Sequence, residues 1–371
     1  VKKQLISDVP VGSYLSGGID SGSITAIAAN NIQKSNKVLN TFTIGFDLTN
    51  SNGLERSYDE RAMAELMSYK FKTEHYEMVL KSGDMERCLR DFSYHLEEPR
   101  VGQSYPNYYA AKLASKFVKV VLSGIGGDEL FAGYPWRYFK ASNNKNFDDY
   151  IDKYYQYWQR LIPNKEIINL FSPILNDVKN VWTRDIFKSI FKSTHLGNSS
   201  EDYINHSLYF EAKTFLHGLL VVEDKLSMAH SIETRVPFLD NDLVDFAQKI
   251  PVKYKLRDIN KIVKTNENEI KKIEKTNDGK IILRQSISDY LPEKINKAAK
   301  QGFSSPDQNW FRGESIEFIK EKLLNNNSNI FEYLDKSTVH KLVNQHLSGK
   351  ENRRLLLWSL LNFESWKNIY G

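Results

Sequence analysis

Cysteine is almost absent from this chain, which carries one, Cys88, in 371 residues. Neither a disulfide framework nor a cysteine-rich metal site can be built from a single thiol. Cys88 lies in the helix-like segment DMERCLRDF, so we predict a packed structural thiol rather than a nucleophile. Long apolar runs are missing too, because stretches such as residues 118–122 and 215–222 fall far short of the ~20 residues that cross a bilayer. We therefore expect no membrane partner.

Several familiar motifs are also lacking. The eight histidines show no HExxH or other short metal-ligand spacing, so each is interpreted as an individual surface or core residue. The chain has neither the GK[ST] end of a P-loop nor a GxGxxG spacing, which gives no support to γ-phosphate transfer or dinucleotide binding. The net charge of +5 is modest and lysines are interspersed with acidic residues, so no nucleic-acid partner is indicated. The first residues contain no apolar secretory stretch, and a cytoplasmic location is the working expectation.

What is present is the composition of a globular protein, with 41% hydrophobic and 26% charged residues. In the first third, short β-rich runs alternate with segments whose apolar residues recur at the helical spacing of about 3.6. This alternation predicts an α/β fold, in which a parallel sheet is flanked by helices. The expected strands are residues 11–15, 39–46, 73–80 and 118–122, and the helices between them include ITAIAANNI, DERAMAELMSYKF and NYYAAKLASKF.

The character of the sequence changes near residue 140, after which helical patterns rich in aromatic residues, lysine and asparagine dominate. We expect residues 141–371 to be mostly α-helical, with few strands. Within them, residues 257–280 have many charged and amide side chains and few large apolar ones. Such a segment buries too little surface to offset its ordering entropy, so we predict an exposed helical or flexible insertion there.

One short loop carries the strongest indication of chemistry. It connects the first expected strand to the first expected helix and consists of Ser16, Gly17, Gly18, Ile19, Asp20 and Ser21. Glycines let backbone amides approach an anion, and a helix N-terminus adds unpaired N–H groups and a positive dipole end. The two serine hydroxyls can donate to the same oxygens. The loop therefore predicts a phosphate or pyrophosphate site, and the plain alternative is a Gly-Ser turn that caps a helix.

Asp20 in such a loop calls for a cation, because a carboxylate and a phosphate repel each other unless a positive charge lies between them. A magnesium ion meets this need. A second cluster, SGIGGDELFAGY at residues 123–134, follows the expected strand at 118–122, at the strand end where open α/β sheets bind ligands. We therefore expect Asp128 to meet Asp20 across one magnesium ion. The alternative is that Asp128 and Glu129 only cap a following helix.

With both loops identified, four long segments resemble, in order, the synthetase domain of glutamine-dependent asparagine synthetases, within the pyrophosphatase-loop family of ATP enzymes. The segments are SDVPVGSYLSGGIDS, SGIGGDELFAGY, DKLSMAHSIETRVPFLD and ILRQSISDYLPEKINKAAKQGFSSP. The resemblance spans nearly the whole chain. It implies an adenine nucleotide alpha hydrolase-like fold, with an ATP-binding α/β core at residues 1–140 and a mainly helical part at residues 141–371 that completes the synthetase site.

The resemblance also assigns roles to individual residues. It implies that Asp20 and Asp128 bind magnesium, that Asp128 and Lys300 are catalytic, and that Lys300, in KQGFSS, neutralises the phosphates as an acyl-adenylate forms. Without that motif, Lys300 would be one lysine among many near the surface. The residues implied to contact ATP are Leu15, Ser16, Gly17, Gly18, Asp20, Ser21, Ile44, Ser123 and Gly124.

The reaction so implied is asparagine synthesis with ATP and Mg²⁺. The side-chain carboxylate of aspartate attacks the α-phosphorus, β-aspartyl-AMP and pyrophosphate form, and ammonia then displaces AMP. The physical logic holds without the resemblance, because a carboxylate is a poor electrophile and AMP makes it a good one. Charge that grows on the phosphates is met by Mg²⁺, Lys300 and loop amides. No covalent enzyme nucleophile is required.

Three features depart from the family pattern. Ile125 stands where asparagine synthetases typically have a glutamate associated with forming the intermediate. At the segment HLEEPRVGQSYP, asparagine-forming members of the family carry a Thr- and Arg-containing stretch that resembles an aspartate clamp. This chain differs at the matching positions, where Arg100 is the nearest cationic residue. The family's N-terminal glutaminase domain is not part of this sequence. We expect an excised synthetase domain supplied with ammonia from glutamine, and the use of free ammonia or another amine stays open.

Two other interpretations remain. Ile125 and the altered segment after Glu98 favour a related amide-forming ligase that adenylates another carboxylate, such as a sugar acid or a peptide side chain, as in exopolysaccharide amidation or peptide macrocyclisation. The other is a catalytically silent nucleotide-binding module that acts as a partner or regulator, and the retention of Asp20, Asp128 and Lys300 argues against it. The sequence leaves the oligomeric state open, a homodimer included.

Overall fold

The centre of the structure is a parallel β-sheet. The computed structural model describes residues 1–49, 55, 58–142, 144–191, 197–259, 277–300, 302 and 305–371. Within them the sheet has five strands, in the spatial order β3 (Glu74–Leu80), β2 (Asn40–Phe46), β1 (Val11–Tyr14), β4 (Val120–Leu122) and β5 (Glu233–Arg235). Every pairing is parallel. The predicted α/β fold is confirmed, and the four expected strands are present with ends shifted by one or two residues.

The fifth strand was not predicted. β5 pairs with β4, with Val120 opposite Glu233 and Leu122 opposite Arg235. It consists of Glu-Thr-Arg, so it shows neither an apolar run nor an apolar alternation that would mark it as a strand. A segment from the otherwise helical second part of the chain therefore completes the sheet.

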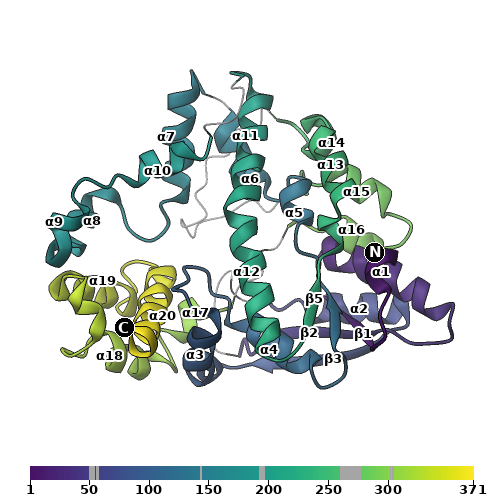
Figure 1. Cartoon of the computed structure of the whole chain (residues 1–371), viewed down its shortest axis with the longest axis horizontal. Helices are drawn as coiled ribbons and strands as arrows, with labels where there is room; N and C mark the ends of the chain where they lie inside the picture. The colour runs from purple at the N-terminus through teal and green to yellow at the C-terminus, as the bar shows by residue number, and fades with distance from the viewer. Residues whose placement is uncertain are drawn as a thin grey trace.

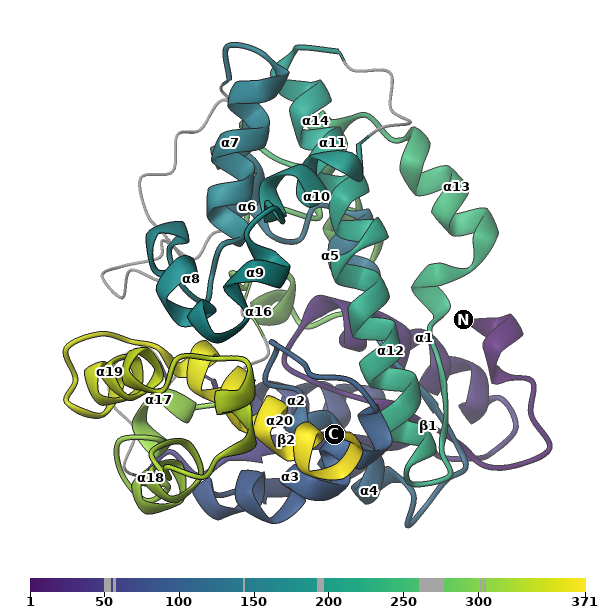
Figure 2. The ribbon, with the colours of Figure 1, turned by 60° about the vertical axis from the view of Figure 1, so that its left-hand side comes forward.

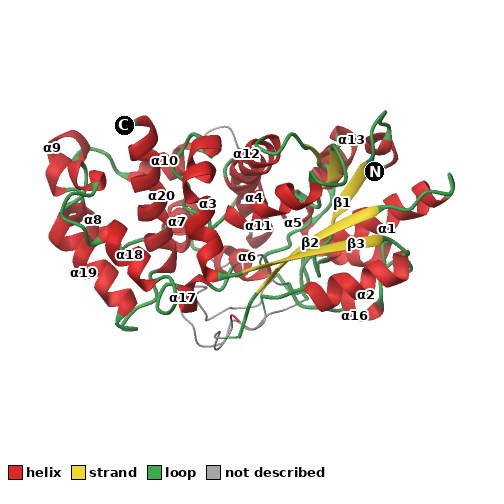
Figure 3. Cartoon of the chain, turned by 90° about the horizontal axis from the view of Figure 1, so that it is seen from below, coloured by secondary structure: helices red, strands yellow, loops and turns green. Residues whose placement is uncertain are grey.

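Helices cover both faces of the sheet. α1 (Ile19–Gln33) and α2 (Arg61–Phe71) pack on one face, and α4 (Tyr105–Ala114) packs on the other against β2 and β3. Figure 3 shows α2 and α4 on opposite sides of the strands. This layering follows from parallel pairing, because the chain must cross from one end of the sheet to the other between strands, and a helix makes that crossing.

α3 (Ser82–Leu96) carries the lone cysteine. Cys88 is 2% exposed within the main hydrophobic core, and burial raises its pKa to about 12. The predicted packed thiol is confirmed, since such a group stays protonated and is a poor nucleophile. The C-terminal helix α20 (Arg354–Tyr370) lies on α3 (Figure 2). Between the two helices, Trp358 meets Phe92 edge to face.

The second part of the chain is mainly helical, as expected. α12 (Phe215–Met228) runs through the middle of the molecule, from α11 (Ser200–Lys213) toward the sheet (Figure 1). No helix in the described ranges is long and apolar enough to cross a membrane. The remaining elements are η1 (Lys2–Leu5), α5 (Gly127–Leu130), α6 (Pro135–Ser142), α7 (Phe147–Trp158), α8 (Asn164–Leu170), η3 (Ser172–Ile174), α9 (Leu175–Val178), α10 (Thr183–Ser189), η4 (Pro237–Leu239), α13 (Asn241–Lys249), α14 (Val252–Lys255), α15 (Ile281–Ser286), α16 (Glu293–Asn296), α17 (Asp307–Trp310), α18 (Ile316–Leu323), η5 (Asn329–Glu332) and α19 (Lys336–Leu347).

The predicted insertion at residues 257–280 needs a correction at its end. Residues 260–276 lie outside the described part of the chain. Asp278 and Lys280 are 9% and 3% exposed, and Gly279 forms an antiparallel bridge with Leu256. The backbone N–H of Lys280 donates to the carbonyl of Phe131 at 3.0 Å. The prediction of an exposed segment is therefore wrong for residues 278–280, because tertiary contacts hold them in the interior.

Candidate active site

Two loops meet at one edge of the sheet. β1 and β4 are neighbours and run parallel, so the loop after β1 and the loop after β4 emerge side by side. They touch at Gly124, where an added Cβ would lie 2.7 Å from the backbone nitrogen of Ser21 and 3.0 Å from the carbonyl carbon of Asp20. No side chain fits in that gap. Gly124 therefore allows the two loops to form one wall of a site.

A cavity of about 850 Å³ opens beside this wall, which is large enough for a nucleotide and a second substrate. Gly17 alone among the predicted site residues does not line it, because Gly17 packs against Glu60 and Met63, whose Cβ atoms would lie 3.0 Å from an added Cβ. The predicted site residues that do line it are Leu15, Ser16, Gly18, Asp20, Ser21, Ile44, Ser123, Gly124, Asp128 and Lys300.

The loop between β1 and α1 is braced from within. Ser21 Oγ accepts from the backbone N–H of Ser16 at 3.0 Å and lies 2.9 Å from Ser16 Oγ, which in turn accepts from the N–H of Gly18 at 3.1 Å. No side chain caps the N-terminus of α1 at Gly18. The first amide N–H groups of a long helix are thus left facing the cavity, where they suit a phosphate group.

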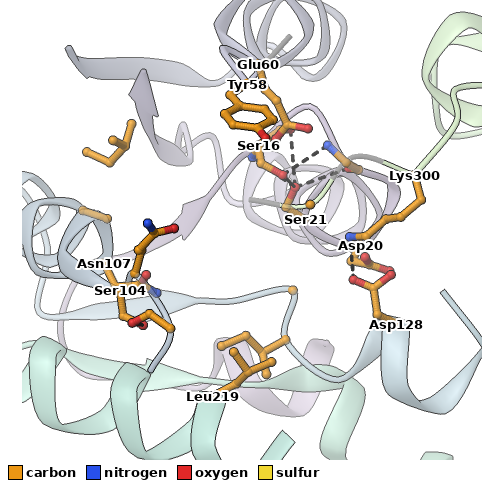
Figure 4. A pocket seen from close by; sticks show the side chains of 18 of the residues that line it. Ser16, Asp20, Ser21, Tyr58, Glu60, Ser104, Asn107, Asp128, Leu219 and Lys300 are labelled. Carbon is orange, nitrogen blue, oxygen red and sulfur yellow. Dashed lines mark hydrogen bonds and ion pairs between the residues drawn. The ribbon is translucent and has the colours of Figure 1, made fainter. Parts of the chain in front are cut away.

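Four charged side chains meet next to this helix end, and Figure 4 shows three of them, Asp20, Asp128 and Lys300. The ammonium of Lys280 pairs with both Asp20 and Asp128, at 2.5 Å from Asp128 Oδ1, and the ammonium of Lys300 lies 2.6 Å from Asp128 Oδ2. The side chains of both aspartates are 12% exposed, and that of Lys280 is 4% exposed. The structure thus brings together the three residues predicted to carry the chemistry and adds Lys280.

The ionisation of this cluster follows from burial and pairing. Burial alone would raise the pKa of Asp128, but Lys280 and Lys300 outweigh it and hold that pKa well below its usual range. Burial raises the pKa of Asp20, although Lys280 opposes the shift. The carboxylates in turn raise the pKa of Lys300 against its burial. The positive charges of the two ammonium groups and the negative charges of the aspartates therefore nearly cancel before any nucleotide binds.

The aspartates also fit a magnesium ion. Mg²⁺ prefers oxygen ligands and usually takes one or two carboxylates together with substrate phosphates. Asp20 Oδ1 is buried and has no hydrogen-bond partner among the described residues. The described residues contain no group of three or more His, Cys, Asp or Glu side chains that could hold a metal. The donor set thus suits an ion that arrives with a nucleotide rather than one held by protein ligands alone.

Lys280 is the residue that sequence reasoning missed. It ends a long charged stretch, which led us to place it on the surface. One feature could have identified it: Lys280 directly precedes the apolar residues Ile281, Ile282 and Leu283, which begin α15. A lysine at the junction between a charged stretch and a packed helix can reach into the interior while its backbone is held by the helix start.

The sequence profile of the family described as asparagine synthase matches residues 1–368. The chain belongs to the asparagine synthase family. The resemblance noted from the sequence motifs is thereby confirmed, and the match includes both loops and all four charged residues of the cluster.

Individual members of the asparagine synthase family are similar to this chain at modest identity. Asparagine synthetase [glutamine-hydrolyzing] 1 of Bacillus subtilis is 27% identical over 406 residues, which covers 100% of this chain and 57% of the relative. A putative asparagine synthetase of Mycobacterium tuberculosis is 27% identical over 402 residues, covering 100% and 56%. A putative asparagine synthetase 2 of Methanocaldococcus jannaschii is 40% identical over 135 residues, covering 36% and 24%. The chain spans little more than half the length of the first two relatives.

Gly124→Ala tests whether the two loops must touch in this family member. The added methyl would lie closer to the Ser21 nitrogen than real contacts allow, so one loop must shift. Displacements of about 1 Å in a catalytic site can cost ~100-fold in rate, and we expect pyrophosphate release from ATP to fall by about that factor. Gly83→Ala in α3 is the matched control, because its added Cβ meets only the flexible end of Arg87. Equal rates for both variants would contradict a functional contact between the loops.

Proposed function

We propose that this chain catalyses ATP-dependent, AMP-forming amide synthesis, with aspartate as the acceptor and asparagine as the product. One observation carries the proposal: Asp20, Asp128 and Lys300 line a cavity of about 850 Å³ beside the uncapped N-terminus of α1, and Lys280 pairs with both aspartates. Oxygen-rich, multiply charged anions such as pyrophosphate are the ligands that such a helix end and two ammonium groups attract. The names of the relatives agree with this reaction.

The proposed reaction has two steps. A carboxylate oxygen of the acceptor bonds to the α-phosphorus of ATP, and the bond from that phosphorus to pyrophosphate breaks, so pyrophosphate leaves with the electron pair. The nitrogen of ammonia then bonds to the acyl carbon, AMP leaves with the carbon–oxygen electron pair, and the surplus proton passes to solvent. The protein holds the reacting groups in line and meets the charge that develops on the phosphates.

Each residue of the cluster has a proposed part. The amides of residues 18–21 and the hydroxyls of Ser16 and Ser21 bind the departing pyrophosphate. Lys280 and Lys300 neutralise its growing negative charge. Asp20 and Asp128 orient the two ammonium groups and hold Mg²⁺, which when bound would withdraw charge from the phosphate oxygens. Leu15, Ile44, Ser123 and Gly124 line the part of the cavity assigned to the rest of ATP.

The proposal extends to the arrangement of the whole protein. Residues 1–140 supply the nucleotide loops, and residues 141–371 supply Lys280, Lys300 and most of the helices around the acceptor. Ammonia comes from glutamine through a glutaminase domain, as the names of the longer relatives suggest. We place the reaction in the cytoplasm. A homodimer is the oligomeric state that we would test first.

A second candidate is a ligase of the same chemistry that acts on another carboxylate. The observation that favours it is Ile125, which lines the cavity and offers no acid or base to the acceptor. A sugar acid or a peptide side chain would then replace aspartate. The catalytically silent module receives little support, because two paired, largely buried carboxylates and the buried ammonium of Lys280 are costly to maintain without a ligand that uses them.

One assay separates these functions. The chain is incubated with ATP, Mg²⁺, ammonium and aspartate, and pyrophosphate, AMP and asparagine are measured. We expect all three products in equal amounts. If pyrophosphate forms only with a uronic acid or a peptide carboxylate, the second candidate, a ligase that acts on another carboxylate, is supported instead. If no acceptor yields pyrophosphate, the chain is the catalytically silent nucleotide-binding module, and the proposal of catalysis is wrong.

A further inference from the structure

The two lysines of the charged cluster come from neighbouring helical segments. Lys280 immediately precedes α15 and is its N-cap residue, and Lys300 lies beyond the C-terminal end of α16. Figure 1 shows α15 and α16 next to each other. Neither lysine belongs to the body of a helix, so intrahelical hydrogen bonds do not hold its backbone. The two ammonium groups can meet at the aspartates only if other contacts keep these segments in a fixed relative position.

The backbone of Lys280 is in an unfavourable conformation. Its φ of 59° lies in the left-handed region, which costs a residue with a side chain about 1 kcal/mol. Such a conformation persists only where the surrounding structure determines it, and it is concentrated at functional sites. Here it lets the chain turn into α15 while the ammonium reaches Asp20 and Asp128. The position of this ammonium therefore depends on whatever holds the backbone beside it.

The side chain of Arg284, on α15, makes such contacts to both segments. Its Nε donates to the carbonyl of Gly279 at 2.9 Å, directly before Lys280. Its Nη1 and Nη2 donate to the carbonyls of Asn296 and Ala298, the latter at 3.1 Å. The backbone N–H of Arg284 also donates to the carbonyl of Lys280 at 2.8 Å. One guanidinium thus connects the main chain beside the first lysine to the main chain that leads to the second.

These contacts require the shape of a guanidinium. Its N–H donors point in several directions from one plane, whereas an ammonium is a compact point charge. Arg284 forms no salt bridge with any carboxylate in the part of the chain that the structure describes. Burial lowers its pKa, and the charges of Asp20 and Asp128 oppose the shift. The guanidinium therefore serves the backbone rather than an ion pair.

The connected segments are also fixed against α1. Ile287, Leu291 and Ile295 are buried in the hydrophobic cluster that contains the start of this helix. Leu291 lies against Gly22, where an added Cβ would be 3.1 Å from the leucine Cδ2. The helix end proposed to bind pyrophosphate and the segments that carry the lysines thus share one packed core.

We infer that Arg284 is a positioning residue, which holds Lys280 and Lys300 in one unit so that both ammonium groups reach the departing pyrophosphate together. Arg284 itself does not line the described cavity, so it acts through the two lysines. The inference rests on the proposed function and deepens it, because it names the contact that presents two lysines from different segments at one site.

Arg284→Ala tests this role through the kinetics of pyrophosphate release. A misplacement of about 1 Å in a catalytic site can cost ~100-fold in rate, and we expect kcat to fall by about that factor. KM for the acceptor should stay within about twofold, because the lost interaction acts on charge that develops in the transition state. Arg257→Ala is the matched control, since it removes a neighbouring, exposed arginine and should retain full activity.

Free guanidinium distinguishes a positioning role from a loss of folding. Guanidinium chloride well below its denaturing concentration should raise the activity of Arg284→Ala by about tenfold, as hydrogen bonds of a charged group allow. Sodium chloride at equal concentration should not. Arg284→Lys keeps the charge and much of the side-chain length, and we expect it to lose about tenfold or more. It keeps the test decisive if Arg284→Ala does not fold, because full activity of Arg284→Lys would overturn the inference.

A double-mutant cycle shows whether Arg284 acts through the lysines. Residues that act through one another give effects that do not add. Arg284→Ala should therefore cost about tenfold or less in a Lys280→Met protein, against ~100-fold in the unaltered protein. An undiminished loss in the Lys280→Met protein would show an independent role for Arg284 and overturn the inference.

Amide hydrogen exchange tests the same contact without turnover. The N–H groups of Lys280, Lys297 and Ala298 each donate to a main-chain carbonyl. Arg284→Ala should speed their exchange by about tenfold or more, because it frees both segments to open locally. The N–H of Leu130 on α5 is the internal control and should exchange at its normal rate.

The outcomes are separate from those of the proposed function. If no acid yields pyrophosphate, the proposed function fails, and hydrogen exchange together with calorimetric binding of Mg²⁺-pyrophosphate decides the inference. Faster exchange and weaker binding in Arg284→Ala than in Arg257→Ala would support it. Unchanged exchange at residues 280, 297 and 298 would overturn it, whether or not the unaltered protein turns over ATP.

Discussion

Replacing Asp20 with alanine is expected to abolish pyrophosphate release from ATP, with kcat/KM falling by about a thousandfold or more, as for other electrostatic groups that act on developing charge. The reason lies in its contacts. Asp20 sits in the first turn of α1, packs against Gly127, where an added Cβ would lie 2.3 Å from Oδ1, and pairs with the ammonium of Lys280. Its loss removes a proposed metal ligand and frees Lys280 from one of its two anchors.

The loss of activity must be separated from loss of folding. Removing one member of a buried charged cluster destabilises proteins by about 3 kcal/mol, although Lys280 keeps Asp128 as a partner. Thermal unfolding is therefore measured beside activity. Asp245→Ala, at an exposed position of α13, is the matched control and should retain full activity. A folded Asp20→Ala protein that turns over ATP at the normal rate would refute the role of this carboxylate.

The part of the fold that sequence patterns revealed is the part with regular periodicity. β2 alternates apolar with small residues, β3 and β4 end in runs of apolar residues, and α1, α2 and α4 repeat their apolar residues at the helical spacing, so both element types could be identified. β5 could not, because three residues with two charges carry no such pattern. Its place in the sheet is determined by pairing with β4, a contact between segments more than 100 residues apart.

The candidate site divides in the same way. Asp20 and Asp128 were predicted because each lies in a glycine-rich loop after a strand, where parallel topology alone brings them together. Lys280 lies at the end of a segment whose pattern indicates exposure to solvent. Only the position of the start of α15 relative to the two loops brings its ammonium into contact with Asp20 and Asp128. Contacts between segments far apart in the sequence cannot be predicted from the local pattern of either segment.

Lys280→Met is expected to lower kcat/KM for pyrophosphate release by about 100- to 1,000-fold, because the ammonium that contacts both aspartates is lost while the length of the side chain is kept. Lys300→Met should lower activity to a similar extent. The two variants should differ in stability. Lys280 is 4% exposed and pairs with two carboxylates, whereas Lys300 is 20% exposed and pairs with one.

Without Lys280, the carboxylates of Asp20 and Asp128 are buried near each other with only Lys300 to balance them, which costs about 3 kcal/mol of unfolding free energy. Urea unfolding of the two variants measures this difference. We expect Lys280→Arg to restore neither activity nor stability. An added Cβ on Gly133 would lie only 2.6 Å from the Lys280 Cε, so the backbone there leaves no room for the larger guanidinium. If Lys280→Met were as stable and as active as the unaltered protein, Lys280 would be a structural bystander, and the neutralisation of pyrophosphate would fall to Lys300 alone.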